Sequence, residues 1–152
     1  MKQIVFEIQG EAVGKGRPRF THGGHTYTPE RTRLYERKVR RAYMEAGGTM
    51  FVAPIHIDIE AVSGIQASAT KAARARRLSG DELSIRKPDI DNFCKIILDA
   101  LNGLAYQDDV GVVSVRVIKG RYESEPRLIV RVRETSPAEV NEIHGWLWDE
   151  QA

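Results

Sequence analysis

Alternating apolar and polar positions mark the strands of this chain. In FVAPIHIDIEAV, isoleucines occupy every second position from Ile55 to Ile59, and His56 lies among the polar residues between them. Successive side chains of a strand point to opposite faces, so we expect the isoleucines to be buried and His56 to be exposed. Weaker versions of this pattern predict strands at 3–8, 110–119 and 127–134.

A period of three to four residues marks the first long helix, which is expected to begin at about Pro29 with Thr28 as its N-cap. The Gly47-Gly48 pair is expected to stop it. The polar side of this helix is strongly basic. Its expected apolar stripe comprises Tyr35, Val39, Ala42, Tyr43 and Ala46.

Two further helices have clear boundary signals. One follows Asp91, ends at Asn102-Gly103, and has apolar residues at the spacing of a buried face. The other begins at SPAE, where Ser136 and Glu139 fit a capping box. Its Trp146 and Trp148 are expected to pack on the sheet or on a partner subunit. The apolar stripe of the first of these helices comprises Phe93, Ile96, Ile97, Ala100 and Leu101.

Residues 67–79, ASATKAARARRLS, are rich in alanine and arginine and predict either a helix or a mobile basic arm. The segment has little apolar surface with which to dock, which favours mobility. The full order of elements is β-α-β-(α)-α-β-β-α. It predicts one α+β domain over 1–152, a two-layer α/β sandwich whose mixed sheet has about four to five strands covered by helices.

Composition excludes several classes of protein. The chain is 41% hydrophobic and 29% charged, as in ordinary globular domains. No apolar run is long enough to span a membrane, and MKQIVFEIQG lacks the pattern of a signal peptide. Cys94, the single cysteine, cannot form an internal disulfide, so we expect a cytoplasmic protein. No clustered His/Cys pattern indicates a structural zinc site.

The net charge of +2 is unevenly distributed. Residues 1–80 hold fourteen Lys and Arg against seven Asp and Glu, whereas residues 81–152 hold nine against fourteen. This asymmetry fits a nucleic-acid surface beside an acidic site, and equally fits two differently solvated faces.

Two acidic pairs carry the candidate chemistry. Asp89 and Asp91 lie in KPDIDNFCK, and Asp108 and Asp109 follow in AYQDDV. A helix leading out from the first pair and a strand returning from the second can place Asp109 beside Asp89 and Asp91. Converging carboxylates bind Mg²⁺ or Mn²⁺, which polarise phosphoryl oxygens and activate water.

A purely structural interpretation remains open at this point. Asp89 and Asp91 also suit a helix N-terminus, and Asp108-Asp109 also suits a turn. Lys95 falls at helical spacing between Asp91 and Asp99, so it either pairs with them or neutralises a phosphate.

The motif residues resemble the RusA family of Holliday-junction resolvases. The likeness rests on K-P-D-x-D-N-x-x-K, D-A-L-N-G and a paired D-D in order, and extends upstream to GKGRPRF and HTYTP, spanning most of 10–118. It implies a homodimeric, Mg²⁺-dependent endonuclease of branched DNA (four-way junctions). It also implies metal-binding and catalytic roles for Asp89, Asp91 and Asp109, a catalytic role for Lys95, and supporting roles for Asp99 and Asp108.

The resemblance implies that the basic residues bind DNA, because DNA binding depends on neutralising phosphates. GKGR lacks the spacing of a P-loop, so nucleoside triphosphate binding is not expected. Two alternatives remain: a non-catalytic branched-DNA-binding protein, and a metal-dependent nuclease acting on RNA or flaps. The candidate DNA contacts are Lys15, Arg17, Arg19, Arg31, Arg37, Lys38, Arg40, Arg74, Arg76, Arg77 and Lys87.

Overall fold

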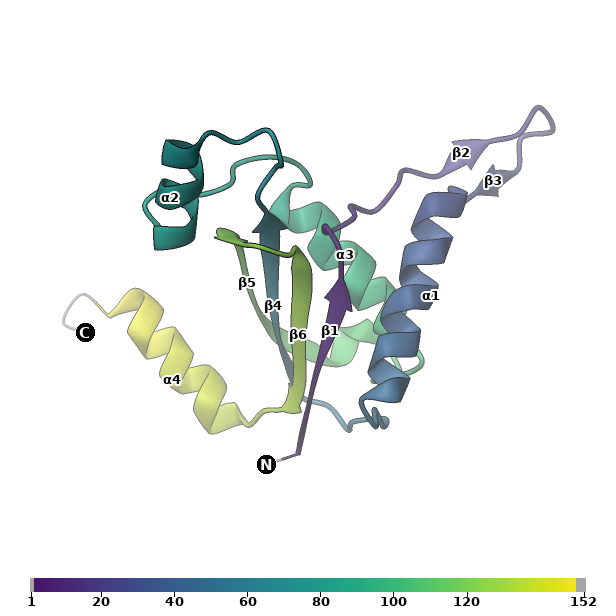
Figure 1. Ribbon diagram of the computed structural model, residues 1–152. Coiled ribbons are helices and arrows are strands. Elements are labelled where there is room, and N and C mark those ends of the chain that lie inside the picture. The colour runs from purple at the N-terminus through teal and green to yellow at the C-terminus, as the bar shows by residue number, and fades with distance from the viewer. Residues whose placement is uncertain (1, 150–152) are drawn as a thin grey trace.

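The computed structural model describes residues 2–149 as an α+β domain with a four-stranded mixed sheet and four helices, as the sequence predicts (Figure 1). The strand order is β1-β6-β4-β5; β6 runs antiparallel to both β1 and β4, whereas β5 runs parallel to β4. The strands are β1 (Gln3–Gln9), β4 (Ile55–Gly64), β5 (Val112–Glu123) and β6 (Arg127–Glu134).

Helices α1 (Glu30–Glu45) and α3 (Ile90–Leu101) cover one face of the sheet (Figure 1). The alternating isoleucines of β4 point into this layer, and Ile57 is fully buried. The predicted stripe of α3 is buried throughout, since all five of its apolar residues belong to the core. The guanidinium of Arg40 on α1 donates to the carbonyls of Ala100 and Asn102, which joins α1 to the end of α3.

Two details of α1 differ from the sequence prediction. Pro29, rather than Thr28, is the N-cap, and no side chain caps the helix there. The helix ends at Glu45, so Ala46 is the exposed C-cap residue and does not extend the apolar stripe. Gly47 provides the stop as predicted, with a positive φ of 80° that suits glycine.

The prediction that His56 is exposed was wrong. His56 is 5% exposed, and its ring lies 2.9 Å from Ser114 Oγ and 3.0 Å from the Asp58 carboxylate. Arg116 and Arg131 on the neighbouring strands donate to the same carboxylate. β4 is a central strand, so cross-strand partners cover even its polar face. Although burial opposes ionisation, the hydrogen bond and charge of His56 and the two guanidiniums lower the pKa of Asp58.

The basic segment forms a helix, α2 (Lys71–Ser79), which is the first of the two alternatives. Thr70 caps its start by accepting from Ala73, and Gly80 ends it with a φ of 86°. A short hairpin that was not predicted lies in the first basic loop, where β2 (Arg19–Phe20) pairs with β3 (Thr26–Tyr27), and it extends away from the sheet (Figure 1).

The last helix, α4 (Pro137–Trp148), begins with the predicted capping box. Ser136 Oγ accepts from the Glu139 amide, and the Glu139 carboxylate is bound in return by the Ser136 backbone. The two tryptophans do not pack on the sheet, because Trp146 is 74% exposed and Trp148 71% exposed. None of the helices within residues 2–149 has the length and apolar character needed to cross a membrane.

Candidate functional site

Asp89 occupies the N-cap of α3, but its carboxylate does not perform the capping. The backbone carbonyl of Asp89 instead accepts from the amides of Asn92 and Phe93, at 3.2 and 3.3 Å. Asp91 follows in the first turn, and both side chains are exposed. Asp89 therefore does not act as the side-chain cap that its position suggested, and both carboxylates are available to bind a ligand.

The second acidic pair lies in the turn before β5. Asp108 takes the structural role foreseen for it, because its carboxylate accepts from the Val110 amide and caps the single 3₁₀ turn Asp109–Gly111. Asp109 is hydrogen-bonded to Asp108 and also experiences the charge of Asp99. These contacts raise the pKa of the Asp109 carboxyl, against the opposing effect of Lys95.

Lys95 lies on α3 between the two acidic groups. Its ammonium is 3.5 Å from Asp99, and its side chain is 64% exposed. Asp91 is one helical turn before it, and Asp109 is close enough for Lys95 to stabilise the Asp109 carboxylate electrostatically. Within residues 2–149, no three Asp, Glu, His or Cys side chains are grouped closely enough to hold a metal ion. Joint metal binding by Asp89, Asp91 and Asp109 therefore stays a prediction.

Lys15 connects the first basic loop to this helix. Its ammonium lies between Glu36 of α1 and Asp99 of α3, 3.1 Å from the latter. Partial burial opposes ionisation, but the two carboxylates raise the pKa of Lys15. Lys15 was predicted to contact DNA, and Glu36 was not predicted to take part; in the structure Lys15 is paired with both Glu36 and Asp99 and neutralises Asp99.

The glycines of GKG allow this close approach. A Cβ on Gly14 would lie 3.1 Å from Pro88 and 3.2 Å from Asn92, and one on Gly16 would lie 2.6 Å from Thr32 Oγ1. The Lys15 amide donates to the Asn92 carbonyl, and the Gly16 amide donates to Thr32. The segment therefore packs between the starts of α1 and α3, which explains its glycines without any phosphate-binding loop.

A groove of about 560 Å³ opens beside Asp89. Arg31, Arg86 and Lys87 line it, with Asn92 from the first turn of α3. Arg86 was missed by the sequence analysis, because one arginine between two predicted elements gives no periodic signal. Lys15 and Glu11 also line the groove, so it combines two carboxylates with four cationic side chains, and cations of this kind bind the phosphates of nucleic acids.

Lys119 of β5 holds the loop that leads to Asp89, and it too was missed. Its ammonium donates to the carbonyls of Arg86 at 2.9 Å and Pro88 at 3.2 Å. Such charge-assisted bonds fix the backbone immediately before the N-cap of α3. The sheet therefore positions the carboxylate end of the groove.

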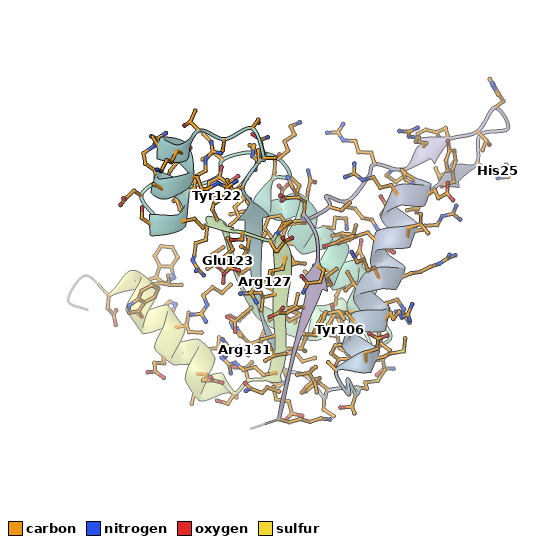
Figure 2. The ribbon with its side chains drawn as sticks, in the orientation of Figure 1. His25, Tyr106, Tyr122, Glu123, Arg127 and Arg131 are labelled. Atoms are coloured by element: carbon orange, nitrogen blue, oxygen red, sulfur yellow. The ribbon has the colours of Figure 1, made fainter. Side chains whose placement is uncertain are left out.

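The remaining candidate DNA contacts fall into two groups. Arg40 and Arg77 are occupied within the chain: Arg40 by the end of α3, and Arg77 by Glu82 and by the ring of Tyr122. Figure 2 shows Tyr122 at the α2 side of the sheet. Lys38 donates to the Gln9 carbonyl, and Arg76 is 3.5 Å from Glu82, although both side chains are exposed. The second group consists of exposed side chains that remain available for DNA phosphates: Arg17, Arg19, Arg31, Arg37, Arg74 and Lys87.

Comparison with known proteins covers most of this structure. Residues 9–133 match the family model described as endodeoxyribonuclease RusA. The chain is also 32% identical over 142 residues to a protein of Bacillus subtilis (strain 168) named uncharacterized protein YqaN, covering 90% of this chain and 99% of that protein. The matched range includes both acidic pairs, Lys95 and the groove.

Proposed function

The chain belongs to the RusA endodeoxyribonuclease family, and from this premise we propose that it resolves four-way DNA junctions by paired, symmetric nicks in recombination and repair. The observation that carries the proposal is the Asp89 carboxylate. It stands at the start of α3 without capping that helix, and it faces a groove lined by Arg31, Arg86 and Lys87.

The donor chemistry of Asp89, Asp91 and Asp109 suits a divalent cation, although in this structure the three carboxylates are not grouped closely enough to hold one together. Asp89, Asp91 and Asp109 offer hard carboxylate oxygens, the donors that Mg²⁺ and Mn²⁺ prefer. The hydrogen bond to Asp108, and then the charges of Asp108 and Asp99, raise the pKa of the Asp109 carboxyl, and a cation would offset these negative charges. We propose that the three carboxylates hold Mg²⁺, with Mn²⁺ as a substitute; the bound ion would activate water and polarise the scissile phosphate.

The protein's own residues would supply the other requirements of phosphodiester hydrolysis. Lys95 projects from α3 one turn beyond Asp91 and is largely exposed, so its ammonium would neutralise charge developing on the phosphate. Arg31, Arg86 and Lys87 would hold the strand in the groove through its phosphates. Lys15 and Asp99 would position these groups rather than bind DNA, because they are already paired.

Two sites are needed for paired nicks. A four-way junction has two-fold symmetry, so a homodimer would present two equivalent sites to strands of like polarity. The exposed Arg17, Arg19 and Arg37 would extend the phosphate-binding surface along the hairpin and α1. We place this activity in the cytoplasm, where chromosomal or phage DNA would be the substrate.

The test is a comparison of substrates under one set of conditions. Purified protein with Mg²⁺ is incubated with a labelled four-way junction, linear duplex, flap and RNA hairpin of equal length. We expect cleavage of the junction alone, at symmetric positions on two strands. Preferential cleavage of the flap or the RNA would replace the junction as substrate, and binding without cleavage of any of them would support a non-catalytic protein.

A further inference from the structure

A hairpin with exposed aromatic side chains projects from the first basic loop. Its strands β2 and β3 pair Arg19 with Tyr27 and Phe20 with Thr26. Within the described part of the chain these two strands pair only with each other, and they extend away from the sheet beyond the start of α1 (Figure 1). Phe20 is 75% exposed and Tyr27 is 46% exposed. Burial of these rings therefore contributes little to the stability of the fold.

Hydrogen bonds hold the turn of the hairpin in one conformation. The Thr21 amide donates to the His25 carbonyl at 2.8 Å, and the Gly24 amide donates to the Thr21 carbonyl at 3.0 Å. The His25 amide donates to Thr21 Oγ1, and Gly24 has a φ of 79° that suits glycine. Figure 2 shows His25 on the outer part of the projection. Because a two-stranded hairpin alone is marginally stable in water, this turn helps to keep the exposed rings in place.

The charge of the loop indicates a nucleic acid as its partner. Residues 12–29 contain three Lys and Arg and two His, and they contain no Asp or Glu. Every residue from 17 to 27 is exposed. Cations beside exposed aromatic rings bind unstacked nucleic acid, because the cations neutralise phosphates while bases stack on the rings. DNA therefore matches both the charge and the aromatic character of the hairpin.

The hairpin leaves the domain and returns to it beside the groove. The Gly16 amide donates to Thr32 Oγ1 in the first turn of α1. A Cβ on Gly16 would lie 3.0 Å from Pro29, so both ends of the loop meet at the start of α1. Arg31, which follows Pro29 by two residues, lines the groove. A DNA strand held in the groove therefore passes close to the base of the hairpin.

We propose that the hairpin binds the branch point of the DNA, where Phe20 stacks on the face of a base. In a continuous duplex each base is covered by its neighbours, so a ring gains access only at the cost of unstacking them. This cost is lower where the stack is already interrupted. Arg19 lies beside Tyr27 on the other face of the hairpin and neutralises a flanking phosphate. The inference rests on the proposed function and assigns to the hairpin the preference for branched over linear DNA.

The first test measures binding in Ca²⁺ by fluorescence anisotropy of a labelled four-way junction and of a linear duplex. Phe20→Ala should raise the dissociation constant of the junction by about ten- to thirtyfold and that of the duplex by less than about twofold. Phe20→Trp keeps an aromatic face and should stay within about threefold of wild type on both. Arg19→Gln should weaken both to a similar extent. Val52→Ala, in the loop between the end of α1 and β4, is the control of matched exposure (77%) and should change neither.

The second test locates the ring on the DNA. 5-Iododeoxyuridine placed at the branch point cross-links on irradiation to an aromatic ring that stacks on it, and mass spectrometry identifies the residue. We expect a cross-link to Phe20 from the branch point and none from the middle of an arm. A bound junction without a cross-link to the hairpin would overturn the inference, and so would equal cross-linking from an arm.

Thermal unfolding of each variant confirms that the chain still folds. An equal loss of junction and duplex affinity in Phe20→Ala would mean that the hairpin binds DNA regardless of branching, and unchanged affinity for both would remove it from the DNA; either result overturns the inference. Wild-type cleavage in Mg²⁺ is measured separately, so paired nicks in the junction would leave the proposed function standing in both cases. A wild type that binds junction and duplex equally and cleaves neither would overturn both proposals.

Discussion

Replacing Lys119 with methionine should slow DNA cleavage without weakening DNA binding. Lys119 donates to the carbonyls of Arg86 and Pro88, and these two bonds hold the backbone that leads into Asp89. Methionine keeps the apolar stem of the side chain and removes both donors. The groove would keep its cations, but the carboxylate would no longer be fixed at one position.

The expected fall in the cleavage rate follows from the free energy of the two hydrogen bonds that Lys119 donates. Each charge-assisted hydrogen bond contributes about 1.5–3 kcal/mol when well shielded, and partial exposure of these two reduces their combined value to about 2 kcal/mol. A loss of this size changes the population of the ordered loop by about thirtyfold. We therefore expect the cleavage rate to fall by about ten- to thirtyfold, with the dissociation constant of the junction changed by less than about threefold.

Single-turnover cleavage with enzyme in excess over a labelled junction measures the rate, and fluorescence anisotropy in Ca²⁺ measures binding. Lys2→Met is the matched control, because Lys2 lies over the ring of Phe51 and neither residue lines the groove. It should cleave at the wild-type rate. A cleavage rate for Lys119→Met within twofold of wild type would refute the positioning role, as would a loss of binding equal to the loss of rate.

Three further predictions follow from the same structure. Titration calorimetry with Mn²⁺ should show a binding site that is lost in Asp109→Asn, and unchanged Mn²⁺ binding by that variant would remove Asp109 from the metal site. The pKa of Asp58 is lower in the folded chain than its ordinary value of 3.8, so ionised Asp58 stabilises the fold at pH values above 3.8. This stabilisation is lost as the pH falls through the pKa that Asp58 has in the folded chain. Urea midpoints should therefore fall less steeply on acidification for Asp58→Asn than for wild type, and parallel profiles would contradict the assignment. Ile57→Ala, at a fully buried position, should reduce the free energy of unfolding by about 2–5 kcal/mol in urea denaturation, and a cost below about 1 kcal/mol would mean that β4 is not central to the core.

Periodic patterns predicted the elements of this fold well. The isoleucines of β4 and the stripe of α3 are buried as their spacing indicates, because a continuous apolar face has one low-energy arrangement. The errors lie where partners distant in sequence decide the outcome. His56 is buried because Ser114, Arg116 and Arg131 lie on neighbouring strands, and no local pattern contains that information.

The candidate site was predicted less completely for the same reason. The ordered motif predicts that Asp89, Asp91, Lys95 and the Asp108-Asp109 pair form one site, and this stays a prediction. It implied a metal-binding role for Asp89 and a supporting role for Asp108, but it did not predict that the Asp108 carboxylate caps a turn whereas the Asp89 carboxylate caps nothing. Charge alone also assigned Lys15 to DNA, although Glu36 and Asp99 already neutralise it. Arg86 and Lys119 carried no sequence signal, because only the sheet brings them to the groove.

Cleavage of four-way junctions at a centre that contains Asp91 is tested by comparing wild type with Asp91→Asn on one four-way junction in Mg²⁺, with each strand labelled in turn. Wild type should nick two strands at symmetric positions, and the products should be ligatable. Asp91→Asn should bind the junction with unchanged affinity and leave it intact, because the substitution removes a carboxylate charge and retains the shape of the side chain. Cleavage by Asp91→Asn at the wild-type rate would exclude Asp91 from the catalytic centre. The absence of paired nicks by a wild-type protein that binds the junction would show that it is not a junction resolvase.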